Sequence, residues 1–153
     1  MWTGKLLHIH IAKAAGEKMQ ELQEANLTAG IGIDGDRYAL GTGKYSPYPD
    51  IREVTLFETE TLEALSRDHD IDLPPHEHRR NLTTEGVPLN HLVGRRFRVG
   101  SVTLIGGRLN IPCRYLERVT GKRVYALLKH RSGLNCRIVE SGTIATGDDI
   151  RPA

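Results

Sequence analysis

The sequence predicts a mainly β protein, a small barrel or sandwich with a few short helices. Three observations support this class: several short segments of β character, turn signals between them, and few stretches with helical spacing. The chain has 153 residues, of which 39% are hydrophobic and 26% charged, and this is the composition of an ordinary globular domain. We therefore expect residues 1–153 to form one domain with its own core.

The first third of the chain predicts one strand and one long loop. Leucine and isoleucine alternate with His8 and His10 over residues 7–11, which is the period of a strand with one buried face. Residues 18–27 have helix-forming side chains between glycines, so helix and strand stay alternatives there. Residues 30–50 are rich in glycine and proline, and we expect a long loop of the kind that is often functional.

The middle of the chain predicts a strand followed by a helix. Residues 52–57 are rich in β-branched and aromatic side chains, which favours a strand. Residues 58–67 have apolar side chains at helical spacing, with Thr59 or Thr61 as the capping residue. The proline pair at 74–75 ends any helix before that point.

The last third of the chain predicts two hairpins separated by helices. Residues 97–105 alternate around a Gly-Ser turn, which is typical of a hairpin. Residues 115–119 and 124–128 have helical spacing on either side of a glycine, which predicts two short helices. Apolar and polar residues alternate over residues 134–150 around a Ser-Gly pair at 141–142, which predicts another hairpin.

Composition and charge exclude several classes of protein. No stretch approaches the ~20 apolar residues of a membrane span, so we expect no membrane partner. The first residues lack the pattern of a secretory signal, and we expect a cytoplasmic location with both cysteines reduced. A net charge of +2 and a pI of about 8.6 are too mild for a nucleic-acid binder, so a nucleic-acid partner is not expected.

Cys113 is the strongest candidate for chemistry. It follows a proline and precedes Arg114, whose positive charge favours the thiolate, the form of cysteine that attacks electrophiles and ligates metals. The alternative is that Cys113 is a small buried apolar residue.

Two glycine-containing segments could contact an anion. In residues 30–37 the glycines leave the backbone free to approach a ligand, and Arg37 offers a fork of donors. The alternative is a tight turn held by an Asp36 hydrogen bond. Residues 130–133 place Arg131 beside a serine and a glycine, and here the alternative is a plain turn.

Residues 79–86 form the densest array of hydrogen-bond donors. Arg79 and Arg80 are followed by Asn81 and Thr83, and such a group suits a phosphate or a polar heterocycle. A solvated charged edge is the alternative.

Two histidine pairs raise the question of zinc. His8 and His10 share one strand face, and His76 and His78 flank a glutamate. Catalytic zinc sites usually have three protein ligands, so we expect these histidines to be bystanders.

Five segments, taken in order, resemble the MOSC family, named for the C-terminal domain of molybdenum-cofactor sulfurases. They are residues 32–38, 52–56, 79–86, 112–116 and 133–148. The resemblance covers nearly the whole chain. It implies a compact β-barrel that binds the molybdenum cofactor, molybdopterin with its metal, or handles sulfur destined for it.

The resemblance also implies roles for particular residues. The cysteine that matches Cys113 is expected to ligate molybdenum or to carry sulfur, and the residues that match Arg79 and Asn81 are expected to hold the pterin and its phosphate. The loop with Asp36 and Arg37 is expected near the same pocket. Cys136 matches a position that is usually small, and we expect it in the core.

Three positions depart from the family pattern. Tyr38 stands where many relatives have histidine, and Ile111 and Arg114 replace residues expected to be smaller or acidic.

The leading hypothesis is that the protein binds a molybdopterin-type cofactor through the Cys113 thiolate and an arginine-rich pocket. It would support redox chemistry on a small substrate, for instance an N-oxygenated compound, with an electron-transfer partner. A second hypothesis is a sulfur carrier that receives a persulfide on Cys113 from a cysteine desulfurase. A third is a non-catalytic module that binds an anion or a heterocycle. Oxidoreductase and sulfur transferase both stay open as activities.

Overall fold

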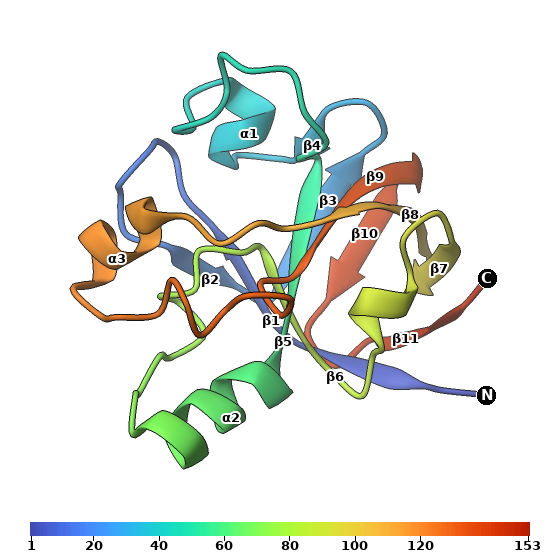
Figure 1. Cartoon of the computed structure of the whole chain (residues 1–153). Coiled ribbons are helices and arrows are strands. Elements are labelled where there is room, and N and C mark those ends of the chain that lie inside the picture. The colour runs from blue at the N-terminus through green and yellow to red at the C-terminus, as the bar shows by residue number, and fades with distance from the viewer.

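Seven strands form a closed ring in the computed structural model, which describes residues 1–153 (Figure 1). Their order is β11-β7-β8-β9-β5-β6-β1, and pairing of β1 with β11 closes the ring. The strands are β1 (Gly4–Ile11), β5 (Val54–Glu58), β6 (Leu82–Glu85), β7 (Arg96–Val99), β8 (Val102–Leu109), β9 (Leu134–Glu140) and β11 (Asp149–Pro152). The predicted mainly β class is therefore confirmed, and its form is a barrel.

Four short strands and four helical segments surround the barrel. The strand β2 (Gln20–Leu22) extends β1, and a small second sheet joins β10 (Gly142–Ala145), β3 (Glu24–Thr28) and β4 (Gly32–Ile33). The helices are α1 (Arg37–Leu40), α2 (Thr59–His69), α3 (Arg114–Thr120) and the 3-10 turn η1 (Leu89–His91). No helix has the length and apolar character needed to cross a membrane.

The core fills the barrel with the inward side chains of its strands. In β7 the buried Phe97 and Val99 alternate with the exposed Arg96 and Arg98, as the period of two requires. A second, smaller apolar cluster lies outside the barrel and joins Phe57 to residues of α2, α3 and the segments that flank them. This second cluster anchors α3, which borders the cavity described below.

Several sequence predictions hold. The strand at 52–57 is β5, the helix at 58–67 is α2, and the hairpin at 97–105 is β7 with β8. The undecided segment at 18–27 forms strands, and the long loop at 30–50 contains β4 and α1. The predicted threonine cap of α2 is wrong, because Glu58 is the N-cap residue and no side chain caps the helix.

Two predictions about the last third of the chain are wrong. The strands within residues 134–150 do not pair with each other, since β9 pairs with β8 and β5, β10 pairs with β3, and β11 pairs with β7 and β1. The second predicted helix at 124–128 is a series of turns. In both places the apolar spacing reports burial correctly, but it does not specify the hydrogen-bond partner.

The strand predicted at 7–11 begins earlier and has an irregular register. The pairing of β1 with β6 shifts between Leu6 and His8. As a result Leu6 and Ile9 are fully buried, whereas Leu7 is only partly buried. Ile9 and Ile11 are buried as the alternation predicts, and the bulge explains why Leu6 takes the buried position expected for Leu7.

Candidate functional site

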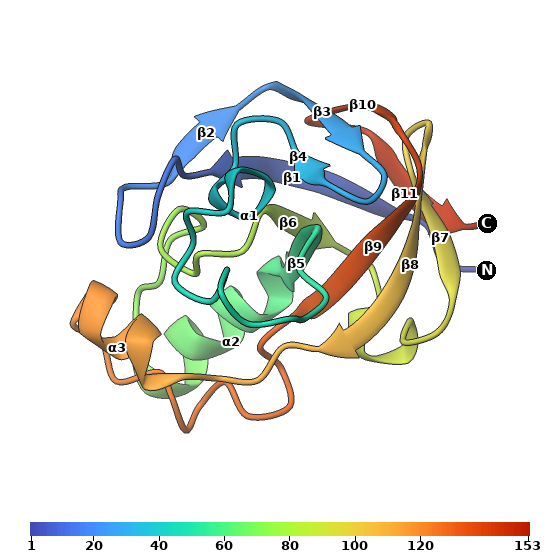
Figure 2. The same cartoon turned by 90° about the horizontal axis from the view of Figure 1, so that it is seen from above.

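A cavity of about 290 Å³ opens beside the barrel, between α1, the loop that follows it, and the start of α3. Figure 2 shows α3 and the strands β7 and β11 at opposite ends of the molecule, with α1 between them. The cavity is strongly cationic. Its basic lining residues are Arg37, Lys44, Arg52, Arg79, Arg80 and Arg108. Cys113 lines the same cavity and is partly buried.

Asp36 and Arg37 are held by one another at the start of α1. The buried Asp36 carboxylate accepts hydrogen bonds from Tyr38 N at 3.3 Å, Ala12 N at 3.2 Å and Arg37 Nη1 at 3.0 Å. Arg37 Nη2 then donates to the Arg79 carbonyl at 2.9 Å. Arg37 therefore lines the cavity in a fixed orientation, while Asp36 lies behind it and does not line the cavity.

Arg79 has the least satisfied guanidinium in the cavity. Its Nη1 donates to the Glu17 carbonyl at 2.6 Å, whereas its Nη2 is buried and has no hydrogen-bond partner. Burial lowers the pKa of Arg79, and the nearby Arg37 adds to this. The backbone of Arg79 has φ 67°, a left-handed conformation that a non-glycine residue rarely adopts. A strained residue with an unpaired buried donor is a candidate ligand contact.

Arg80 differs from Arg79 because its donors are almost all used. It donates to the Ser132 carbonyl and hydroxyl at 3.2 and 3.1 Å, to Asn110 Oδ1 at 2.6 Å and to the His78 carbonyl at 3.2 Å. Burial lowers its pKa to about 10, and the nearby Cys113 acts in the opposite direction. Arg80 thus ties together segments that are distant in the sequence and also places a positive charge near the thiol.

His78 lies beneath the arginine pair and is part of the core. Its ring stacks on Phe57 with centroids 4.4 Å apart, and burial holds its pKa well below the usual range. Its Nδ1 accepts from Arg80 N at 2.9 Å, so its Nε2 carries the proton and donates to Thr83 Oγ1 at 2.8 Å. Both ring nitrogens of His78 are therefore used inside the protein.

Three predicted contacts lie away from the cavity wall. Asn81 is buried; its Oδ1 accepts from Thr55 N and Oγ1, both at 3.1 Å, and its Nδ2 donates to the His10 carbonyl. Thr83 is fully buried beside His78. Arg131 Nε donates to the Leu127 carbonyl at 2.8 Å. None of the three lines the cavity. The structure therefore brings Arg37, Arg79, Arg80 and Cys113 together, with Asn81 and Thr83 behind them.

The guanidinium of Arg114 turns away from its neighbour. Its Nη1 lies 3.6 Å from the Glu117 carboxylate, and the group sits 4.5 Å from the centre of the Tyr125 ring. Cys113 itself is the N-cap residue of α3. The positive charges around the thiol therefore come from the cavity arginines, and Arg114 is not one of them.

A wall of three tyrosines was missed by the sequence reasoning. Tyr38, Tyr45 and Tyr115 line the cavity, and the last two meet edge to face at 6.3 Å. The guanidinium of Arg37 lies 4.7 Å from the centre of the Tyr38 ring. Burial, followed by a hydrogen bond with Cys113, raises the pKa of Tyr45 to about 12. The signal that could have found Tyr38 and Tyr45 is the concentration of tyrosine in a short glycine-rich segment, whereas Tyr115 lies in α3 and only the fold brings it to them.

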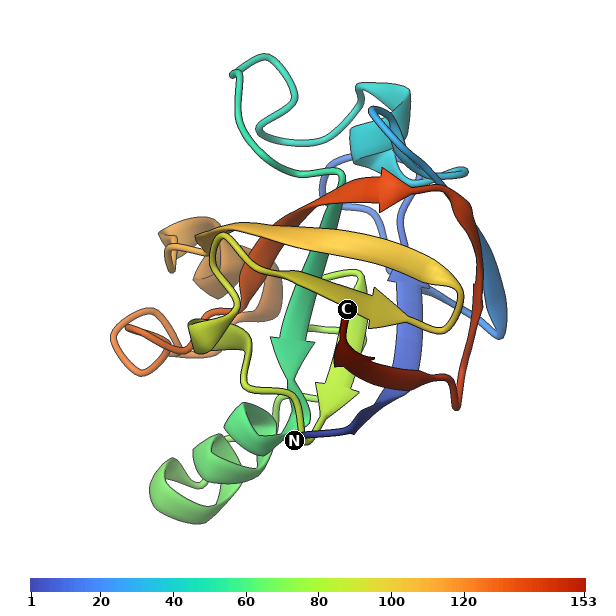
Figure 3. The ribbon, with the colours of Figure 1, turned by 90° about the vertical axis from the view of Figure 1, so that its right-hand side faces the viewer.

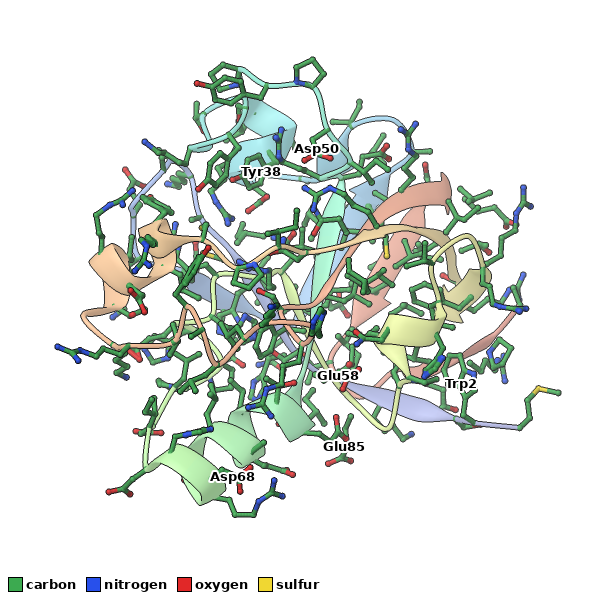
Figure 4. All side chains as sticks on the ribbon, viewed as in Figure 1. Trp2, Tyr38, Asp50, Glu58, Asp68 and Glu85 are labelled. Carbon is green, nitrogen blue, oxygen red and sulfur yellow. The ribbon has the colours of Figure 1, made fainter.

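Asp50 was also missed, and it is the one carboxylate among the cavity's lining residues. Arg108 donates to both of its oxygens, with Nε to Oδ1 at 2.8 Å, and Arg52 Nη2 lies 3.6 Å away. The bond to Arg108 is the main reason that the pKa of Asp50 falls to about 2. Figure 4 places Asp50 near Tyr38, on the loop above β5. Asp50 thus occupies donors that an anionic ligand could use.

A closed barrel that presents an arginine-lined cavity and a partly exposed cysteine defines a β-barrel domain suited to an anionic ligand. The family model described as the MOSC domain matches residues 44–151. The chain therefore belongs to the MOSC family, which confirms the resemblance seen in the sequence. This family is associated with molybdenum-cofactor-related function.

Solved structures of low sequence identity share the fold. The YUAD protein of Bacillus subtilis is 20% identical with a TM-score of 0.79, and the match covers 98% of this chain and 97% of that one. YiiM of Geobacillus stearothermophilus is 11% identical (TM-score 0.76; 98% and 75% covered), and YiiM of Escherichia coli is 17% identical (0.71; 100% and 70%). At these identities the similarity concerns the fold alone. A comparison with curated protein sequences gives no significant match.

Proposed function

We propose that the cavity binds a molybdopterin-type cofactor, with Cys113 as a ligand to its metal. The observation that favours this is that Arg79, whose buried Nη2 has no hydrogen-bond partner, lines the same cavity as Cys113. Guanidinium donors suit an anionic phosphate, and a thiolate suits a soft metal. The volume of about 290 Å³ is close to the lower limit, about 300 Å³, of small-molecule pockets, so the residues present fit the phosphate-bearing part of such a ligand.

Each lining group has a role in this proposal. Arg79 and Arg37 would bind the phosphate, because both have N–H groups left unused by the protein. Tyr38 and Tyr115 would pack against the flat heterocycle. Arg80 would hold the site together and keep a positive charge near Cys113. When bound, the cofactor would supply the redox chemistry on a small substrate, for instance an N-oxygenated compound, with electrons from a partner protein.

Elemental analysis tests this proposal. The protein is purified from a host that makes the cofactor, and its molybdenum content is compared with that of Cys113→Ser. We expect molybdenum in the unmodified protein and its loss in the variant. Cys136→Ala is the matched control, because Cys136 is buried in the core and its loss should leave the metal in place. An unmodified protein that is purified without molybdenum from such a host would contradict the proposal.

A second candidate function is sulfur transfer, favoured by the partial exposure of Cys113 at the cavity. The Cys113 thiolate would attack the outer sulfur of a desulfurase persulfide, and the desulfurase cysteine would leave as a thiolate. Mass spectrometry after incubation with a cysteine desulfurase and cysteine should then show one added sulfur atom on Cys113. If Cys113→Ala keeps full ligand binding, the protein is instead a simple binding module.

A further inference from the structure

A group of exposed arginines lies on the outer face of the barrel, away from the cavity. Arg96, Arg98, Arg137 and Arg151 are all exposed, and we refer to these four residues as the arginine face. They project from β7, β9 and β11, and Figure 3 shows β11, β7 and β8 side by side on the side of the barrel turned to the viewer.

Strand pairing brings these arginines into register. Arg98 lies directly opposite Arg151, and Arg96 lies in one row with Ile105 and Arg137 across β7, β8 and β9. The side chains of directly opposite residues begin about 4.5–5.5 Å apart, and like charges at that position destabilise a sheet. The isolated barrel therefore has an unfavourable charge arrangement at this face.

The protein's own carboxylates do not relieve this arrangement. None of the four arginines forms an ion pair. The pKa of Asp149 is lowered mainly by its hydrogen bond from Lys5 Nζ at 2.5 Å, and Arg151 adds only a smaller effect. Glu140 lies at the end of β9, opposite Thr103, so β8 separates it from Arg98.

Packing does not explain the arginine face either. The core side of β7 is filled by Phe97 and Val99, and the core side of β11 by Ile150. The arginines occupy the outward positions, where any polar residue would keep the barrel soluble. The chain has a net charge of only +2, yet four arginines without ion pairs lie in adjacent rows here. This concentration of positive charge indicates a surface that binds a negatively charged surface.

The residues between the arginines favour a protein partner. Ile105 and Val139 are partly buried and lie on β8 and β9 beside Arg137, so the surface mixes arginine with aliphatic groups, a composition suited to a protein interface. Proteins that bind single-stranded nucleic acid add aromatic side chains on which bases stack, and the two rows of the arginine face hold none. We propose that the arginine face docks an acidic surface of a partner protein, which leaves the cavity free on another side of the barrel.

A binding assay tests this proposal independently of the cavity ligand. Labelled poly-L-glutamate serves as the acidic probe, and its fluorescence anisotropy is measured at low salt. We expect the double variant R98E/R151E to weaken binding at least about tenfold. The matched control R123E/K129E changes the net charge equally at exposed positions elsewhere and should bind as the unmodified protein does, as should the cavity variant Arg79→Gln. Equal binding by R98E/R151E and its control would overturn the proposal.

Two further measurements test the kind of partner and the effect of Arg151 on stability. A mixed-sequence single-stranded oligonucleotide should bind more weakly than poly-L-glutamate, and tighter binding that depends on Arg98 would overturn the choice of a protein partner. Arg151→Glu alone should raise Tm by about 1–3 °C, because it replaces a like-charge pair with an opposite one, while poly-L-glutamate binding falls. A drop in Tm would show that Arg151 has a structural role instead.

Discussion

The cavity and the arginine face are both rich in arginine, but the arginines differ in how many contacts they make with the rest of the protein. In the cavity, Arg37 and Arg80 donate to protein acceptors that fix them, whereas Arg98 and Arg151 on the outer face make no ion pair. The cavity arginines converge on one small volume, and the exposed arginines spread over adjacent strands. An arginine fixed before a ligand arrives favours selection of a small anion, because less side-chain ordering is needed on binding, whereas exposed arginines without ion pairs on adjacent strands are available to a broad surface.

The largest expected effect is on stability, in Arg80→Gln. The variant leaves Asn110, Ser132 and the His78 carbonyl without a donor in a partly buried region, and we expect the free energy of unfolding to fall by about 3 kcal/mol. Urea unfolding followed by circular dichroism measures it. A loss as small as that of an exposed arginine would break the distinction between the two regions.

Arg79→Gln should mainly change ligand binding. The variant loses one hydrogen bond, from Nη1 to the Glu17 carbonyl, while Nη2 has no partner to lose, so the free energy of unfolding should fall by about 1.5 kcal/mol, less than in Arg80→Gln. Loss of the charged donor should weaken binding of inorganic phosphate about tenfold or more, measured by titration calorimetry. Unchanged phosphate affinity would mean that Arg79 does not contact the anion.

Asp50→Asn should strengthen anion binding. The carboxylate engages Arg108 and Arg52, and removing its charge should raise phosphate affinity roughly fivefold, the equivalent of about 1 kcal/mol for a charge 4 Å away in water. Asp68→Asn is the matched control, since Asp68 pairs with Arg67 on α2, far from Asp50 in Figure 4. A weaker affinity in Asp50→Asn would show that Asp50 orders the arginines for the ligand instead of competing with it.

The same carboxylate predicts a pH dependence of stability. The pKa of Asp50 lies at about 2 in the folded protein, below its ordinary 3.8, so its ion pair stabilises the fold above about pH 4 and this contribution is lost as the pH falls through 2. In the unmodified protein the free energy of unfolding should therefore decline as the pH falls from about 4 to about 2. In Asp50→Asn this part of the decline should be absent. Identical acid profiles for the variant and the unmodified protein would contradict this assignment.

The smallest expected effect is in Arg98→Gln. It removes one member of a like-charge pair at an exposed position, so the free energy of unfolding should rise by less than about 0.5 kcal/mol. Phosphate affinity should not change, because Arg98 does not line the cavity. Thermal unfolding and calorimetry measure the two quantities. A large loss of stability in Arg98→Gln would show that this exposed arginine is as important for the fold as Arg80.

The sequence predicted local structure well wherever a short pattern determines it. The alternation around Phe97 and Val99 and the glycine-serine turn after them define the β7–β8 hairpin without reference to the rest of the chain. The prediction failed where the partner is remote in the sequence: the strands within residues 134–150 pair with five other strands, β8, β5, β3, β7 and β1, and no local spacing encodes that choice. The bulge at Leu6 was not predicted for a related reason, since it depends on the pairing of β1 with β6.

The candidate site was predicted in part, for similar reasons. Arg37, Arg79, Arg80 and Cys113 were identified by residue type, and the fold brings them to one cavity. Asn81 was selected for its amide, yet its hydrogen bonds with Thr55 and His10 use it inside the protein. Asp50 was not selected, since its importance depends on Arg108, 58 residues away in the sequence. Residue type suggests chemistry, but the available hydrogen-bonding atoms are decided by tertiary contacts.

Closure of the barrel by β1 and β11 has a consequence for synthesis of the protein. Gly4 and Lys5 pair with Ile150 and Asp149, so the ring cannot close until β11 has left the ribosome, about 145 residues after the start of β1. Until then, β7 and one end of β1 present open strand edges, which can pair with other nascent chains. Both termini lie on the same side of the barrel in Figure 1, where the first and last strands of the ring meet.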